Sequence, residues 1–126
     1  MKKKIFDWKK KTAMYLGRFQ PFHEGHKNLF LKVLKKNNQI AILVMDSYKI
    51  NNKNPFKFSN VKRRIYRELK NYRSKFIIIK VPVISRFVYG RKVGYKIEKI
   101  YLGKKLERIS ATNLRKKIKK NNENYF

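Results

Sequence analysis

A strand, a sharp turn and the start of a helix follow one another within residues 12–27 of this chain. Ala13 to Leu16 is a short apolar run without polar alternation, the pattern of a strand buried on both faces. Gly17 and Pro21 then interrupt the run, and an amphipathic segment with helical spacing follows. A helix that begins after a buried strand presents free N–H groups and the positive end of its dipole. The stretch therefore predicts an anion site.

Side chains that donate to phosphate are concentrated in the same stretch, namely Arg18, His23, His26 and Lys27. The two histidines lie three residues apart, so both can project from the first helical turn towards one site. Gly25 allows the backbone to approach a phosphate closely. A structural hydrogen bond and a metal site are the alternatives for the histidine pair. Zinc takes about four ligands, and the chain has no cysteine and no third histidine, which disfavours metal binding.

Two motifs in the chain resemble those of a known superfamily. Residues 17–26 read Gly-Arg-Phe-Gln-Pro-Phe-His-Glu-Gly-His, and residues 109–115 read Ile-Ser-Ala-Thr-Asn-Leu-Arg. Together they resemble the signature of the HxGH (cytidylyltransferase-like) nucleotidyltransferases, in particular archaeal-type nicotinamide-mononucleotide adenylyltransferases. The resemblance implies an α/β fold of nucleotidyltransferase type, a Rossmann-like three-layer sandwich around a small parallel sheet, with ligands at the carboxyl ends of the strands.

The resemblance also assigns roles to the motif residues. It implies catalytic roles for Arg18, His23, His26 and Arg115, and nucleotide binding by Gly17, Arg18, Phe19, Gln20, Gly25, His26, Ser110, Thr112 and Arg115. Ser110 and Thr112 open a helix predicted over Thr112–Lys120, and an ordinary N-cap is the alternative for Ser110. Mg²⁺ is expected to arrive with the nucleoside triphosphate, and no metal site on the protein is predicted.

The implied enzyme transfers AMP from ATP to a small phosphorylated acceptor and releases pyrophosphate. Residues 105–108 lack the threonine and glycine of the Arg-Thr-x-Gly run found in cytidylyltransferases, which favours ATP over CTP. Nicotinamide mononucleotide is the acceptor suggested, which would place the enzyme in NAD biosynthesis. Predicted acceptor contacts are Asn54, Tyr89, Arg91 and Tyr95, although the last three could equally be core and surface residues. A cytidylyltransferase acting on a sugar or polyol phosphate is the alternative enzyme.

Other apolar patterns predict a helix at about 24–37, a strand at Ile40–Met45, a helix at about 60–72 capped by Ser59, and a strand at Phe76–Val83. The strand–helix–strand order implies parallel strands joined by right-handed crossovers. The residues between 83 and 87 are too few for a further crossover. Lys96–Leu102 alternates like an edge strand.

The length of 126 residues predicts one domain, over 12–120, with a basic leader at 1–11 and a polar tail at 121–126. No apolar run reaches the ~18 residues of a membrane span, and a cysteine-free chain suits a reducing compartment. We therefore predict a cytoplasmic protein with no membrane partner. A homo-oligomer is compatible with the sequence.

The net charge of +28 has two interpretations. The lysines are spread over nearly every segment, as codon usage in an AT-rich genome would produce. Alternatively, the field attracts a polyanion, and the chain is a non-catalytic basic nucleic-acid-binding module with interleaved tyrosines. The two intact phosphate motifs make nucleic acid the less favoured partner. Lys62, Arg63, Arg64 and Arg67 are interpreted as a solvated basic face of a helix.

Overall fold

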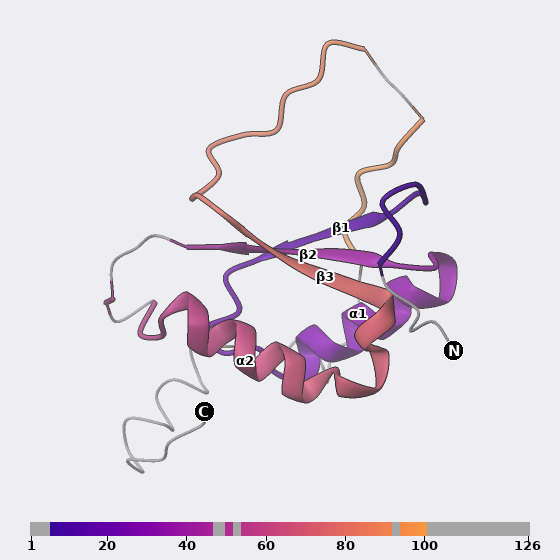
Figure 1. Cartoon of the computed structure of the whole chain (residues 1–126). Coiled ribbons are helices and arrows are strands. Elements are labelled where there is room, and N and C mark those ends of the chain that lie inside the picture. Colours follow the sequence, from indigo (N-terminus) through magenta and orange to yellow (C-terminus); the bar gives the residue numbers. More distant parts are fainter. Residues whose placement is uncertain (1–5, 47–49, 52–53, 92–93, 101–126) are drawn as a thin grey trace.

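A computed structural model describes residues 6–46, 50–51, 54–91 and 94–100 of the protein (Figure 1). In chain order its elements are β1 (Ala13–Gly17), α1 (Glu24–Lys36), β2 (Ile40–Met45), α2 (Phe58–Glu68), the 3-10 helix η1 (Lys70–Lys75) and β3 (Phe76–Val81). The three strands are parallel and lie in the order β1-β2-β3. No helix in the described part of the chain is long and apolar enough to cross a membrane.

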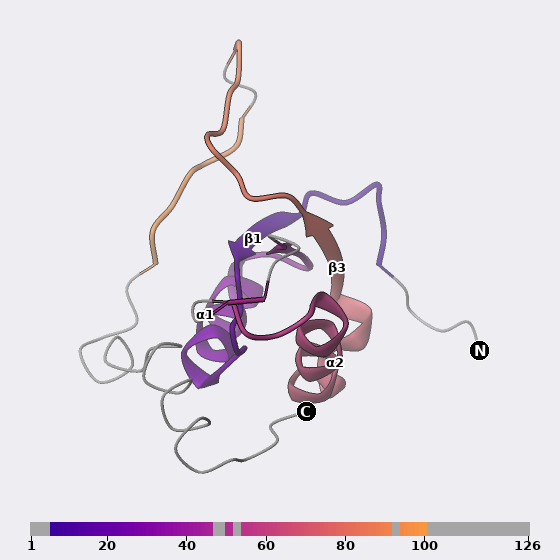
Figure 2. The same ribbon diagram turned by 90° about the vertical axis from the view of Figure 1, so that its left-hand side faces the viewer.

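Both α-helices lie on the same face of the sheet (Figure 2). This follows from the strand order, because successive right-handed crossovers that step in one direction place their helices on one side. The core between sheet and helices consists of Phe19, Phe22, Phe30, Ile40, Ile42, Val44, Val61, Ile65, Leu69, Phe76 and Ile78. The parallel sheet with its connecting helices confirms the predicted α/β class. The predicted last helix, Thr112–Lys120, lies outside the described residues.

The opposite face of the sheet is only partly covered. Met14 on β1 is 66% exposed, and Leu16, Leu43 and Ile79 are half-buried. The prediction that the first strand is buried on both faces was therefore wrong. β1 is an edge strand, and no described helix lies on this face. The chain after β3 arches above it instead (Figures 1 and 2).

Element boundaries agree with the sequence pattern at β2 and differ at α2. The Lys57 carbonyl accepts from the amides of Asn60 at 3.0 Å and Val61 at 3.1 Å, so the helix has already begun at Phe58. Ser59 therefore lies inside α2 and is not its N-cap, as had been predicted. The helix ends at Glu68, earlier than the predicted 72, and η1 follows.

Beyond β3, residues 82–91 and 94–100 contain no helix or strand. β3 ends at Val81, two residues before the predicted end, because Pro82 has no N–H to continue the ladder. The edge strand predicted over Lys96–Leu102 was wrong for residues 96–100, which pair with no strand in the described part of the chain. Residues 101 and 102 lie outside the described residues.

Gln39 attaches the N-terminal segment to the domain. Its Nε2 donates to the Asp7 carbonyl at 2.6 Å and to Thr12 Oγ1 at 2.7 Å, and its Oε1 accepts from the Asp7 amide at 3.1 Å. Gln39 is 3% exposed, so these bonds satisfy a buried amide. The described part of the predicted leader is thus held at Asp7, whereas Trp8 is exposed.

The turn after β1 depends on close contact between Gly17 and Phe19. Phe19 has a φ of 53°, in the left-handed region that side chains rarely adopt, and its ring turns back beneath Gly17. A Cβ atom on Gly17 would lie 2.8 Å from the ring Cζ. The ring cannot retreat, because it is buried against Tyr15, Phe22 and His26.

We expect Gly17→Ala to lower the free energy of unfolding by about 1–3 kcal/mol, the usual cost of forcing an extra methyl group into a packed core. Urea denaturation measures this loss. Gly90→Ala is the matched control, because no atom lies within 4 Å of a Cβ placed there, and its change should stay within about 0.5 kcal/mol. Equal losses in the two variants would contradict the packing argument.

Candidate active site at the N-terminus of α1

Gln20 joins the turn after β1 to the segment before α2. Its Nε2 donates to the Phe56 carbonyl at 3.1 Å, and its Oε1 accepts from the Phe56 amide at 3.0 Å. The side chain is buried, as is the ring of Phe19. Both residues were predicted to bind nucleotide. Their side chains instead hold the turn in place, so any contact they make with a ligand would come from their backbone.

His23 and His26 form a reciprocal cap at the start of α1. The Gly25 amide donates to Nδ1 of His23 at 3.0 Å, and the His23 amide donates to Nδ1 of His26 at 3.1 Å. A ring nitrogen that accepts a hydrogen bond carries no proton, so the proton of each neutral imidazole is on Nε2. The cap therefore leaves each histidine with one N–H donor for a ligand.

The surroundings of the two rings keep them neutral. The imidazoles stack with centroids 3.8 Å apart, and His26 also stacks on Phe22 at 5.5 Å. Burial lowers the pKa of His26 from 6.5 to about 3, with a further contribution from His23. Burial also lowers the pKa of His23 to about 4, assisted by the positive charge of Arg64. Both side chains are thus uncharged donors at neutral pH.

Arg64 reaches this site from α2. Its Nε donates to the Phe22 carbonyl at 2.6 Å, and its side chain is half-buried. The prediction of a solvated basic face was therefore wrong for Arg64, because the motif turn supplies a carbonyl acceptor that the sequence does not reveal. The available signal was its position three residues after the buried Val61, on the same side of the helix.

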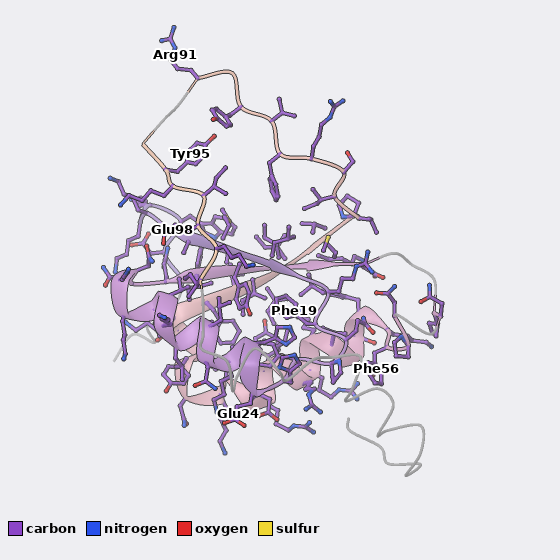
Figure 3. The ribbon with its side chains drawn as sticks, turned by 180° about the vertical axis from the view of Figure 1, so that it is seen from behind. Phe19, Glu24, Phe56, Arg91, Tyr95 and Glu98 are labelled. Atoms are coloured by element: carbon purple, nitrogen blue, oxygen red, sulfur yellow. The ribbon has the colours of Figure 1, made fainter. Side chains whose placement is uncertain are left out.

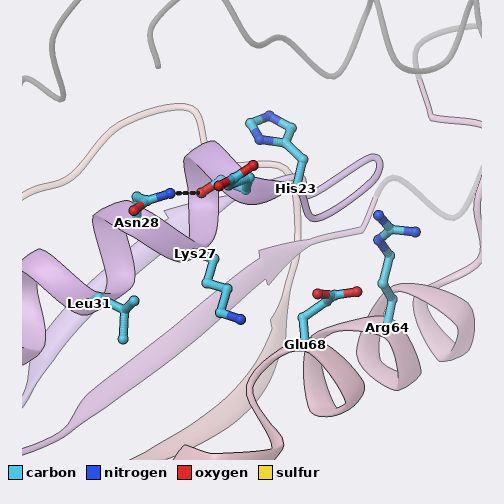
Figure 4. A pocket seen from close by; sticks show the side chains of 7 residues that line it. His23, Lys27, Asn28, Leu31, Arg64 and Glu68 are labelled. Atoms are coloured by element: carbon cyan, nitrogen blue, oxygen red, sulfur yellow. Dashed lines mark hydrogen bonds between the residues drawn. The ribbon is translucent and has the colours of Figure 1, made fainter. Parts of the chain in front are cut away.

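A cavity of about 380 Å³ opens between α1 and α2 beside this cap (Figure 4). It is lined by His23, Glu24, Lys27, Asn28, Leu31, Arg64 and Glu68. Lys27 and Arg64 supply positive charge, and the N-terminus of α1 adds its dipole. Glu24 and Glu68 bring carboxylates to the same cavity. The arrangement can hold a phosphate group from several sides while two carboxylates limit the excess positive charge.

The other predicted site residues fall into three groups: two in the strand–turn–helix unit, one in the segment before α2, and three outside the described residues. Arg18 is exposed directly after β1, and Gly25 is buried in the first turn of α1, so the motif residues come together in one strand–turn–helix unit. Asn54 lies close to Phe56 in the segment that Gln20 holds, where its backbone exchanges two hydrogen bonds with Asn51. Ser110, Thr112 and Arg115 lie outside the described residues.

The structure does not bring Tyr89, Arg91 and Tyr95 to the histidine pair. The two tyrosine rings meet edge to face with centroids 5.7 Å apart. All three residues are exposed on the segment after β3. Figure 3 shows Arg91 and Tyr95 on the other side of the sheet from Glu24 at the start of α1. This placement does not support the acceptor role that the sequence analysis assigned to them.

The comparison with protein families covers the same unit. Residues 14–66 match the family model described as cytidylyltransferase-like. This part of the chain is similar in sequence to that family. The matched segment, as we call residues 14–66, includes the histidine cap and Arg64, and its match confirms the family resemblance of the first motif.

Proteins of known name are also similar to this chain. A nicotinamide-nucleotide adenylyltransferase from Thermoplasma acidophilum is 47% identical over 34 residues, which are 27% of this chain and 19% of the relative. Two crystal structures of a bifunctional NMN adenylyltransferase/ADP ribose pyrophosphatase from Francisella tularensis, one complexed with AMP and a Mn ion, are 27% identical with TM-scores of 0.53 and 0.54. The match covers 58% of this chain and 23% and 22% of those chains.

These neighbours confirm the Rossmann-like fold of nucleotidyltransferase type that the sequence predicts. The chain spans about a fifth of the length of the relatives that it matches.

The two histidines should titrate well below the usual pKa of 6.5. In the unfolded chain they take up protons below about pH 6.5, whereas the folded chain does not. Their contribution to the free energy of unfolding is therefore complete above pH 6.5 and decreases as the pH falls towards 4. NMR titration of the imidazole Cε1–H resonances measures both pKa values. A midpoint near 6.5 for either ring would show that it is solvated and that the cap is not formed.

We expect His23→Ala to lower the free energy of unfolding by about 1 kcal/mol, because it removes the side-chain cap of α1. His23→Asn should cost far less, since asparagine is a good N-cap whose Oδ1 can accept the same amide. Thermal or urea unfolding compares the two variants. A loss in His23→Asn as large as in His23→Ala would indicate that ring stacking, not capping, holds the turn.

Proposed function

We propose that this chain is an adenylyltransferase that transfers AMP from ATP to a small phosphorylated acceptor. The observation that carries the proposal is the histidine cap, which fixes two neutral Nε2–H donors at the N-terminus of α1 beside Arg64. The match of residues 14–66 to the cytidylyltransferase-like family and the names of the relatives support the same reaction class.

In the proposed reaction a phosphate oxygen of the acceptor attacks the α-phosphorus of ATP. The bond to the bridging oxygen breaks, and pyrophosphate leaves with the electron pair. The protein needs to align the two substrates and to stabilise negative charge on the phosphoryl oxygens. His23 and His26 would do so by hydrogen bonding without transferring a proton. Lys27 and Arg64 would add positive charge from the two sides of the cavity.

Mg²⁺ would enter as part of the nucleotide substrate. The carboxylates of Glu24 and Glu68 line the proposed phosphate cavity, and they would repel a bare triphosphate more than its metal complex. The Mn ion in one relative is consistent with the use of a divalent cation. Nicotinamide mononucleotide is the first acceptor to test, because the matched relatives are named for it. ATP is the first donor to test, because those relatives are named as adenylyltransferases and one was solved with AMP.

The test is pyrophosphate release with Mg²⁺ and either ATP or CTP, against a panel of phosphorylated acceptors that includes nicotinamide mononucleotide. His23→Asn keeps the helix cap and removes the Nε2–H donor, so we expect kcat to fall roughly 10²–10³-fold, the usual cost of losing one transition-state donor. Gly90→Ala, on the exposed segment after β3, is the folded control and should keep full activity.

ATP-dependent release with nicotinamide mononucleotide, reduced in His23→Asn, would support the proposal in full. Release with another acceptor would keep the reaction class and change the substrate. CTP-dependent release would favour the cytidylyltransferase alternative. Full activity in His23→Asn would show that the cap is structural, and no release with any pair would overturn the enzyme hypothesis.

A further inference from the structure

The outer surface of α2 and η1 carries a dense set of cations. Residues 57–75 contain Lys57, Lys62, Arg63, Arg64, Arg67, Lys70, Arg73 and Lys75, and Glu68 is the single acid among them. Arg64 turns inward to the cavity. Four of the others are exposed at near-helical spacing, namely Arg63, Arg67, Lys70 and Arg73. We call these four residues the α2 basic row.

Contacts within the chain involve part of this row, since Arg67 forms an ion pair with Glu68 at 3.9 Å and Arg73 lies over the ring of Tyr66. The spacing of the charges is nevertheless unfavourable for the helix. Arg63 and Arg67 are four residues apart on one helix, and like charges at that spacing destabilise it. Lys57 occupies the N-cap of α2 without a side-chain cap bond, and the first turn contains no acidic residue. Hydroxyl or carboxylate side chains are preferred there, because the helix dipole repels a cation. The Arg63–Arg67 repulsion and the cation at the N-cap are therefore unfavourable for α2, which a binding role of this surface would explain.

The choice of arginine argues in the same direction. Nine of the 35 basic residues of the chain are arginines, and three of those nine belong to the α2 basic row. A general bias towards lysine would not concentrate arginine on one helix. The guanidinium fork binds phosphate bidentately, whereas lysine acts as a point charge. Arginine enrichment thus indicates phosphate contacts at this surface.

Geometry indicates which polyanion fits. The helical rise of ~1.5 Å per residue places Arg63 and Arg67 about 6 Å apart along the axis of α2. Lys70 and Arg73 follow on η1, whose backbone is not helical at Tyr72, so the regular interval applies to the α2 part of the row. Arg73 lies over the ring of Tyr66 at 4.1 Å, and Tyr66 and Tyr72 are half-buried. These rings offer no open platform for stacking bases, which single-strand binders require. A duplex, whose bases are already stacked, fits better.

We propose that the α2 basic row binds the phosphate backbone of a nucleic-acid duplex without reading its sequence. Backbone contacts of this kind supply affinity and depend strongly on salt. Arg64 and His23 line the cavity and take no part in this binding. The proposal therefore does not depend on the adenylyltransferase reaction.

The experiment measures fluorescence anisotropy of a labelled mixed-sequence DNA duplex with the full chain over a range of salt concentrations. The row variant is Arg63→Gln/Arg67→Gln/Arg73→Gln. Its matched control is Lys9→Gln/Lys10→Gln/Lys11→Gln, which removes the same charge from an exposed segment. We expect at least a tenfold larger loss of affinity in the row variant. The slope of log K against log salt should become shallower by about 0.9 for each phosphate contact removed.

Circular dichroism establishes whether the row variant is folded. A second variant, Arg63→Lys/Arg67→Lys/Arg73→Lys, keeps the charge and should retain part of the affinity. Pyrophosphate release by the row variant should be unchanged, which separates this surface from the cavity. Equal losses in the row variant and the matched control, tighter binding of oligothymidine than of the duplex, or competition by ATP would each overturn the proposal.

Discussion

Two hydrogen bonds between backbone amides and imidazole nitrogens organise this molecule. They satisfy N–H groups that every helix leaves unpaired in its first turn, and they do so with side chains that retain a second donor. The same contacts fix the tautomer, the stacking and the neutrality of both rings. The start of the helix and the candidate ligand site are thus one structure, so a change that loosens the cap would alter both folding and the proposed chemistry.

Much of this could be read from the sequence. The apolar run Ile40–Met45 predicted β2 to the residue. The segment predicted as a helix at about 60–72 contains Val61, Ile65 and Leu69, which are fully buried. Local patterns are reliable there because burial of a continuous apolar segment leaves few alternatives. The first motif predicts a phosphate site from residue types that lie within ten positions of one another, and that site stays a prediction.

Features that depend on contacts between distant segments were not predictable in this way. Arg64 looked like its solvated neighbours until the Phe22 carbonyl was seen beside it. Gln20 looked like a ligand contact, yet it pairs with the backbone of Phe56, 36 residues away. The alternation of Lys96–Ile100 suggested a strand, but a strand needs a neighbour to pair with, and none is present in the described part of the chain.

The partly covered face of the sheet has a consequence for the colloidal behaviour of the protein. Met14 and the half-buried Leu16 lie on β1, which is an edge strand among the described residues. An exposed, apolar strand edge is a template for pairing between molecules. A net charge of +28 opposes such encounters. That repulsion reaches about 10 Å at 0.1 M salt and only about 3 Å at 1 M. The electrostatic field that draws in anions thus also keeps the copies of this chain dispersed.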